Sequence, residues 1–171
     1  QDKNTDKTSK ALFAVADTPE KILKIPQEKL EKLIFSSGYY KNKAKTIKHV
    51  SKVILEEYGG KVPNDLDELM SIKGIGRKTA TITRVFGFGE ADCIPVDVHV
   101  FIIANRLGWV KEKTPEKTEE ELMKIVPKEY WFEINTLFVL YGKEICQTQS
   151  PFCSKCVISK YCKRVGVVRS R

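Results

Sequence analysis

The sequence lacks any apolar run approaching the roughly 20 residues that a helix needs to cross a bilayer. It also lacks the basic start and short apolar stretch of a secretory signal peptide. These two absences exclude a protein held in the membrane by helical spans. They predict a soluble, intracellular chain, placed in the cytoplasm or nucleoid, or in the nucleus of a eukaryote.

Alternating polar and apolar positions, which mark a β-strand, are also missing, as are internal repeats. Apolar residues recur instead at helical spacing, as at Ile47, Val50 and Ile54. Thr18 before a proline predicts a helix start, and Asn64 is expected to cap a later helix. The basic tail, residues 163–171, is expected to fray. The expected fold class is therefore all-α.

The chain has 171 residues, 42% of them hydrophobic, so it can bury a sizeable core. That length allows one large domain or two small ones. Lysine and arginine number 30 against 22 acidic residues, which gives a net charge of +8. A basic surface suits a polyanion such as DNA, although a merely basic soluble protein has the same charge.

Residues 69–80 are predicted to form a helix, a tight turn with two glycines, and a second helix. Gly74 and Gly76 permit a close backbone approach, and amide groups at the start of the second helix are suited to binding a phosphate. An ordinary helix corner is the alternative. The run at residues 74–80 (GIGRKTA) closely resembles the helix-hairpin-helix element of DNA glycosylases.

Lys78 stands at the start of that second helix, where the helix dipole disfavours a cation. A nucleophilic or Schiff-base lysine must be neutral, so the position suits catalysis, with an ordinary surface lysine as the alternative. Asp97 is a single carboxylate inside an apolar run. We expect it to cap a helix starting near Val98 and, compatibly, to assist chemistry. His99 is expected to be structural.

Four of the five cysteines crowd into one segment with the pattern C-x6-C-x2-C-x5-C. They are Cys146, Cys153, Cys156 and Cys162. Such density in an intracellular chain favours a metal site over disulfides. The spacing alone leaves open a zinc site and an iron–sulfur cluster. Cys93 lies far away and is expected to be a buried free thiol.

The hairpin with Lys78, the Val-Asp-Val-His segment at residues 96–99 and the cysteine pattern together resemble endonuclease III, of the helix-hairpin-helix glycosylase superfamily. Their order and spacing agree over nearly the whole chain. Residues 38–44 (GYYKNKA) also resemble the DNA-inserting loop of that family. The combination is much more specific than any single motif.

The resemblance implies base excision repair by a bifunctional DNA glycosylase, which removes a damaged base and cleaves the abasic site by β-elimination. It implies that Lys78 is the nucleophile that forms a Schiff base, that Asp97 is the catalytic carboxylate, and that the four cysteines hold one [4Fe-4S] cluster. The expected lesion is an oxidised pyrimidine. The expected partner is double-stranded DNA with a damaged base or an abasic site, bound by a monomer.

Two helical lobes are implied as well: residues 1–90, a helical barrel with the hairpin, and residues 91–171, with the cluster, the active site lying between them. The expected DNA contacts are Gln1, Tyr39, Lys43, Gly74, Gly76, Arg77 and Thr79. Tyr39 falls where the family inserts a side chain beside the flipped base, although a packed core aromatic is the alternative. Because the family has helices upstream of this region, the chain is expected to lack an N-terminal segment.

Three rival functions fit parts of the pattern. A monofunctional mismatch glycosylase would share the aspartate and the cluster, but such relatives usually carry another residue in place of Lys78. A non-catalytic DNA-binding module with a structural metal would bind duplex DNA without turnover. An electron-transfer protein would use the cysteine motif but leave the hairpin unexplained.

Overall fold

The computed structural model describes residues 2–171, with side chains from residue 4 onward, and its regular elements in that part are all helical. The all-α prediction is therefore confirmed. The chain groups into two compact units, one that ends at Ile75 and one that spans Gly76–Arg171. The lobe boundary between residues 90 and 91 stays a prediction. Gln1 lies outside the described residues.

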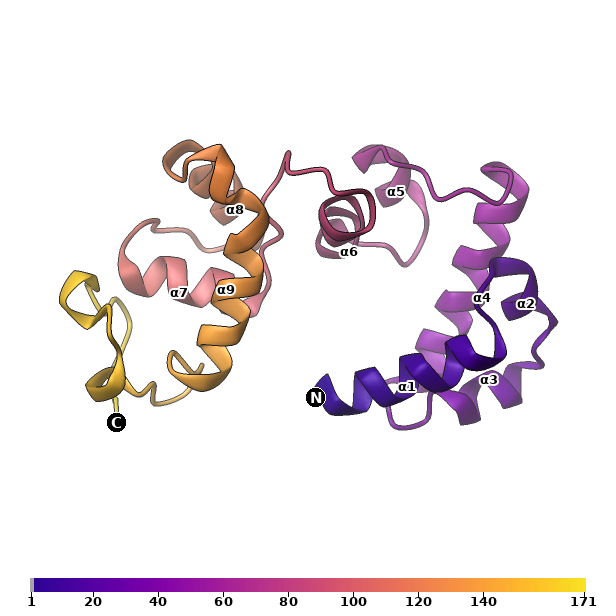
Figure 1. Cartoon of the computed structure of the whole chain (residues 1–171), viewed down its shortest axis with the longest axis horizontal. Helices are drawn as coiled ribbons and strands as arrows, with labels where there is room; N and C mark the ends of the chain where they lie inside the picture. The colour runs from indigo at the N-terminus through magenta and orange to yellow at the C-terminus, as the bar shows by residue number, and fades with distance from the viewer. Residues whose placement is uncertain (1) are drawn as a thin grey trace. The chain divides into compact units, whose positions relative to one another are not determined.

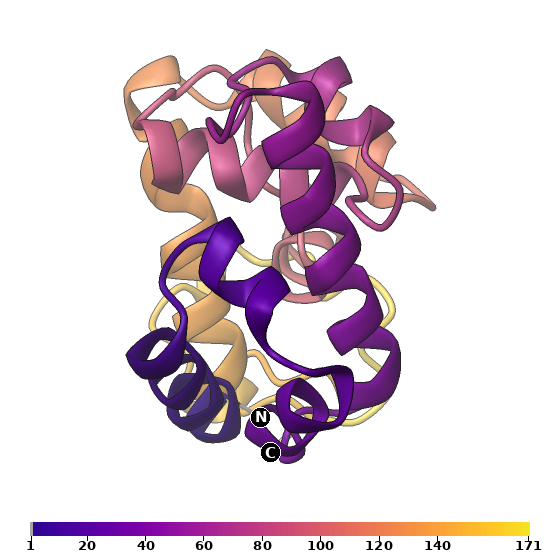
Figure 2. The same cartoon turned by 90° about the vertical axis from the view of Figure 1, so that its right-hand side faces the viewer.

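Five helices build the first unit: α1 (Asp2–Val15), α2 (Pro19–Lys24), α3 (Gln27–Leu33), α4 (Tyr40–Glu57) and α5 (Leu66–Ser71). The long helix α4 packs against α2 and α3, and α1 also contacts α3 (Figures 1 and 2). Their apolar faces bury a core that includes Leu12, Ile22, Leu30, Ile34 and Ala44. The hydrophobic effect therefore holds these helices together.

Side chains cap the starts of two helices of this unit, α2 and α5. The Thr18 hydroxyl accepts a hydrogen bond from the Lys21 N–H at 3.3 Å, which confirms the predicted start of α2. The prediction that Asn64 caps the later helix was wrong by one residue. Asp65 is the cap of α5, because its Oδ1 accepts the N–H groups of Asp67 and Glu68 at 2.9 and 3.0 Å.

The second unit contains α6 (Arg77–Ile82), a π-helical segment (Thr83–Phe88), α7 (Val98–Leu107), α8 (Pro115–Ile125) and α9 (Trp131–Glu144). Short 3₁₀ turns at Lys128–Tyr130, Cys153–Lys155 and Ser159–Tyr161 complete it. Helix α7 packs against α9 and α8 (Figure 1). The core between them includes Ile94, Val100, Ala104, Leu122 and Ile134.

The basic tail is held in place rather than frayed, so the expectation for residues 163–171 was wrong. The Val165 N–H donates to the Arg106 carbonyl at 3.1 Å, and the Arg171 N–H donates to the Pro151 carbonyl at 2.8 Å. The Arg171 guanidinium also lies 3.9 Å from the centre of the Phe152 ring. These contacts tie the tail to α7 and to the segment that carries the cysteines.

The described helices include none with the length and apolar character that a membrane span requires.

Replacing Gly142 by alanine is expected to destabilise the protein by about 1–3 kcal/mol, because a new Cβ would overpack a full interface. Gly142 is buried in α9, and an added Cβ would collide with the imidazole of His99 on α7. His99 thus has a packing role, as expected from the sequence. Denaturant unfolding measures the loss. Gly87→Ala is the matched control, because its Cβ would meet only the Thr83 Cγ2 at 3.8 Å; equal stability of the two variants would contradict the close approach.

Candidate active site and cysteine-lined cavity

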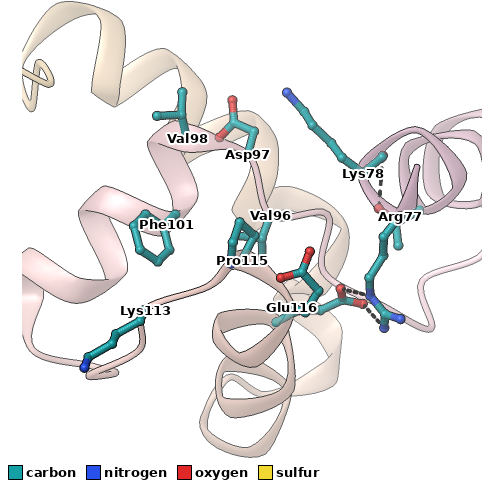
Figure 3. A pocket seen from close by; sticks show the side chains of 11 residues that line it. Arg77, Lys78, Val96, Asp97, Val98, Phe101, Lys113, Pro115 and Glu116 are labelled. Atoms are coloured by element: carbon teal, nitrogen blue, oxygen red, sulfur yellow. Dashed lines mark hydrogen bonds and ion pairs between the residues drawn. The ribbon is translucent and has the colours of Figure 1, made fainter. Parts of the chain in front are cut away.

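A pocket of about 310 Å³ lies within the second unit (Figure 3). Its walls come from three parts of the chain: α6, the segment that leads into α7, and the start of α8. The lining residues are Arg77, Lys78, Thr81, Val96, Asp97, Val98, Phe101, Lys113, Pro115, Glu116 and Glu119. The structure thus brings the two residues expected to be catalytic, Lys78 and Asp97, into one pocket.

Asp97 is the N-cap of α7, as predicted. Its Oδ1 accepts hydrogen bonds from the N–H groups of His99 and Val100 at 2.8 and 2.9 Å. The residue is only 9% exposed, so these bonds fix the carboxylate in one orientation. Hydrogen bonds from the described residues all go to Oδ1, which leaves Oδ2 available to a ligand in the pocket. Capping and chemistry are therefore compatible at this residue.

Lys78 is an exposed residue in the first turn of α6. Figure 3 shows its side chain extending from α6 on the side of the pocket where the Asp97 carboxylate lies. Within the described part of the chain, no hydrogen bond or ion pair engages its amine. No side chain caps the start of α6 either, since Gly76 occupies the N-cap position. An amine held by nothing else is free to react with a ligand.

Arg77, the residue before Lys78, is engaged inside the protein. Its Nε donates to Oε2 of Glu119 at 2.7 Å, and its Nη2 donates to Oε1 at 3.1 Å (Figure 3). This bonding raises the pKa of Arg77. Glu119 could not be recognised from the sequence as the partner of Arg77, because the two residues are 42 positions apart and no local motif indicates the pair.

The turn before α6 is shaped by close packing in the first unit. Gly74 has φ of 101°, and a Cβ there would lie 2.6 Å from Cγ2 of Thr46. Only glycine satisfies both demands. The Ile75 N–H donates to the Ile72 carbonyl at 3.0 Å, which closes the turn. Gly76 and Thr79 are exposed.

Tyr39 and Lys43 lie at the start of α4. Tyr39 is 86% exposed with φ of 56°, so it is not the packed core aromatic that the sequence left open. Its neighbour Tyr40 packs instead, with ring centroids 5.0 Å from those of Phe35. The Lys43 amine donates to the Ser37 hydroxyl at 2.6 Å. The start of α4 thus presents an exposed aromatic ring to solvent.

All four clustered cysteines line one small cavity in the second unit. They are Cys146, Cys153, Cys156 and Cys162, and none forms a disulfide. Among the described residues, no group of three or more histidine, cysteine, aspartate or glutamate side chains converges as for a single metal ion. Four free thiols around one cavity are nevertheless the donor set that a thiolate-bound cluster requires.

Hydrogen-bond donors surround these sulfurs. Nη1 of Arg106 lies 3.4 Å from Sγ of Cys146, and the Tyr141 hydroxyl donates to Sγ of Cys156 at 3.2 Å. The Arg164 N–H donates to Sγ of Cys162 at 3.4 Å. Donors of this kind stabilise anionic sulfur. Sequence reasoning missed Arg106, which sits on α7 far along the chain from the cysteines.

The Arg106 guanidinium also organises the loop backbone. It donates to the carbonyls of Cys146, Gln147 and Thr148 at 3.2, 2.7 and 2.7 Å. One half-buried cation thus satisfies three successive carbonyls as the chain leaves α9. Cys93 lies apart from this cavity. It is buried as expected, and burial raises its pKa to about 12, which keeps it a thiol.

Comparison with known proteins shows which class of protein this chain resembles. The model of the HhH-GPD superfamily of base excision DNA repair proteins matches residues 1–128. Endonuclease III of Thermotoga maritima is 45% identical over 100% of this chain and 82% of its own length. Endonuclease III of Bacillus subtilis is 40% identical over 92% of this chain and 72% of its own length.

Among solved structures, a trapped covalent intermediate of endonuclease III with DNA aligns with a TM-score of 0.89 and 37% identity. The alignment covers 96% of this chain and 77% of that one. Within the HhH-GPD superfamily of base excision DNA repair proteins, this chain belongs to the endonuclease III family. The resemblance read from the sequence is therefore confirmed. The family generally binds a [4Fe-4S] cluster.

Proposed function

We propose that this chain is a bifunctional DNA glycosylase and abasic-site lyase that acts in base excision repair. The observation that carries the proposal is that Lys78 and Asp97 line the same pocket. Within the described part of the chain, the Lys78 amine makes no hydrogen bond or ion pair. A related endonuclease III has been trapped as a covalent intermediate with DNA. The proposed partner of this chain is double-stranded DNA with a damaged base or an abasic site. The proposed location is the part of the cell that holds the DNA.

The reaction needs a nucleotide turned out of the duplex, because the sugar carbon is unreachable in the stack. Neutral Lys78 then attacks C1′ with its Nζ lone pair, and the bond from C1′ to the base breaks with its electrons leaving on the base. Asp97 stabilises the positive charge that develops on the sugar, or accepts a proton from the amine. Its anchored Oδ1 leaves Oδ2 to face these atoms.

Strand cleavage follows on the same covalent adduct. The sugar ring opens to a Schiff base between Nζ of Lys78 and C1′, as the ring oxygen takes up a proton. Loss of a proton from C2′ then expels the 3′ phosphate by β-elimination. Hydrolysis of the imine returns the free lysine. The base expected is an oxidised pyrimidine, as in the resemblance noted above.

The DNA contacts are likewise proposed from the exposure of these residues and from the family resemblance. The exposed start of α6 offers the backbone amides near Gly76 and the hydroxyl of Thr79 to a phosphate. Gly74, which carries no side chain, allows the preceding turn to pack closely against Thr46. In the first unit, the exposed Tyr39 ring suits insertion beside a flipped base, with Lys43 near the backbone. Gln1, which lies outside the described residues, is proposed to fill the space that the flipped base leaves in the duplex, as in the family that the sequence resembles.

Borohydride trapping on a duplex with a single abasic site tests the proposed function. The reductant converts a Schiff base into a stable amine, so the protein should become covalently attached to DNA. Without reductant, the same mixture should yield strands nicked on the 3′ side of the site. A protein that binds abasic DNA but yields neither product would contradict the lyase and leave a monofunctional glycosylase or a binding module.

The four clustered cysteines suit one [4Fe-4S] cluster, held by Cys146, Cys153, Cys156 and Cys162. Bound there, the cluster would supply structure, by crosslinking the segment between α9 and the tail. The hydrogen bonds from Arg106 and Tyr141 to the sulfurs support this assignment. The alternative is a zinc ion bound by the same four thiols.

Replacing Cys153 by serine is expected to remove most of the bound metal, because one of four thiolate ligands is lost. Iron and acid-labile sulfide are measured on purified protein, together with its visible absorbance. Cys93→Ala is the matched control and should keep the parent's metal content, since Cys93 is buried away from the cavity. Zinc in place of iron and sulfide would contradict the cluster.

A further inference from the structure

The bidentate pair of Arg77 and Glu119 joins α6 to α8 directly beside the proposed nucleophile. Two parallel N–H groups of the guanidinium meet the two carboxylate oxygens at 2.7 and 3.1 Å. That fork geometry restricts both distance and direction, unlike a single contact from a lysine. The pair therefore fixes both the distance and the direction of the Arg77 guanidinium relative to Glu119 on α8.

The carboxylate of this pair is out of water. The side chain of Glu119 is 4% exposed, whereas that of Arg77 is 34% exposed. A buried carboxylate is costly unless a cation and hydrogen bonds satisfy it. Among the described residues, Arg77 is the side chain that meets this need. The Arg77 contact is therefore strongly held, and the start of α6 is held with it.

Helix geometry transmits that anchoring to the next residue. Helix α6 has only six residues, and no side chain caps its start. Successive side chains on an α-helix project about 100° apart around the axis. Fixing Arg77 against α8 therefore fixes the rotation of this short helix and the direction of Lys78. Figure 3 shows the side chains of Arg77 and Lys78 leaving α6 in different directions, with Lys78 extending on the side where Asp97 lies.

We propose that Arg77 and Glu119 are positioning residues: their ion pair sets the rotation of α6 so that the Lys78 amine is aimed into the pocket beside Asp97. This inference rests on the proposed function, because it assigns Lys78 as the nucleophile. It gives Arg77 a role different from the DNA contact expected from the sequence. Both residues line the pocket, so the pair also forms part of its wall.

The two roles of Arg77 differ in what they predict for kinetics. A positioning residue acts on the covalent step, where a misplacement of about 1 Å costs on the order of a hundredfold in rate. A phosphate contact acts on the affinity for DNA and on its salt dependence. A purely structural pair would lower the fraction of folded protein without changing the rate constant of what remains folded.

Single-turnover borohydride trapping separates these cases, with Glu119→Gln and Arg77→Lys compared with the parent. Both variants should lower the rate constant for adduct formation by about 10–100-fold. The trapped fraction at the end of the reaction should stay at the parent's level. The Kd for a duplex with a stable abasic-site analogue should change by less than about twofold. Glu121→Gln is the matched control, a partly exposed carboxylate on the same helix that pairs with Lys124 outside the pocket.

Two results would overturn the inference while leaving the lyase intact. Parent-like rate constants with weaker binding of the analogue would make Arg77 a phosphate contact. Parent-like rate constants with a smaller trapped fraction would make the pair structural only. If Glu119→Gln does not fold, Arg77→Lys decides alone, because it keeps a cation opposite Glu119 and loses only the fork. If the unsubstituted protein forms no adduct, the proposed lyase function is contradicted. This inference then fails as well, because it depends on that function.

Discussion

Alanine in place of Lys78 is expected to abolish adduct formation and to slow cleavage of abasic DNA by at least about a thousandfold, since the nucleophile is removed. The change should leave the fold intact. Lys78 is exposed, and within the described part of the chain its amine has no hydrogen bond or ion pair to lose. Removing a cation from a helix start even favours the helix slightly, by about 0.3–1 kcal/mol.

This combination of results is diagnostic, because loss of activity through unfolding would bring a lower stability with it. Single-turnover cleavage and denaturant unfolding are measured on the same samples. Lys124→Ala is the matched control, an exposed lysine of α8 outside the pocket. It should cleave and trap like the parent. A Lys78→Ala variant that still nicked at the parent's rate would remove Lys78 from the mechanism.

The prediction of the fold from the sequence succeeded where the signals are local. Helical spacing of apolar residues and the absence of alternation gave the all-α class. The Thr18 cap and the Asp97 cap each depend on residues a few positions apart. The cap at Asp65 was missed because Asn and Asp are nearly equal as N-caps. Only the backbone decides between such neighbours.

Long-range pairs account for what the sequence could not give. Glu119 meets Arg77 across 42 residues, and Arg106 meets the cysteine segment across about 40. Nothing in the local pattern of α8 or α7 distinguishes these charged residues from solvated ones. The tail was misjudged for the same reason, because Arg171 is held by Pro151, Ser150 and Phe152 rather than by its own sequence neighbours.

Helix α6 is followed by a π-helical segment, Thr83–Phe88, rather than by further α-helix. In this segment the backbone hydrogen bonds join residues five apart rather than four apart, so the helix is wider. The chain then leads on to Asp97. The nucleophile and the carboxylate are thus linked by a segment whose path no periodicity revealed. Their presence in one pocket could be expected only from the family resemblance, because nothing in their spacing brings residues 78 and 97 together.

Asparagine in place of Asp97 is expected to slow the chemistry by about 10²–10⁴-fold while changing stability little, because the amide oxygen still caps α7. In the parent, Oδ1 accepts two N–H groups, and an amide oxygen accepts the same two. What the variant loses is the negative charge, which the proposed mechanism uses against positive charge on the sugar. Trapping rates and denaturant unfolding together measure both consequences.

Alanine at the same position separates the two roles of Asp97 completely. Asp97→Ala loses the cap as well as the charge, so it should be as slow as Asp97→Asn and also less stable by about 0.5–2 kcal/mol. Asp65→Asn is the matched control, a cap of α5 outside the pocket. It should trap at the parent's rate. If Asp97→Asn did so too, the carboxylate would be a helix cap alone, and Lys78 would have to work without it.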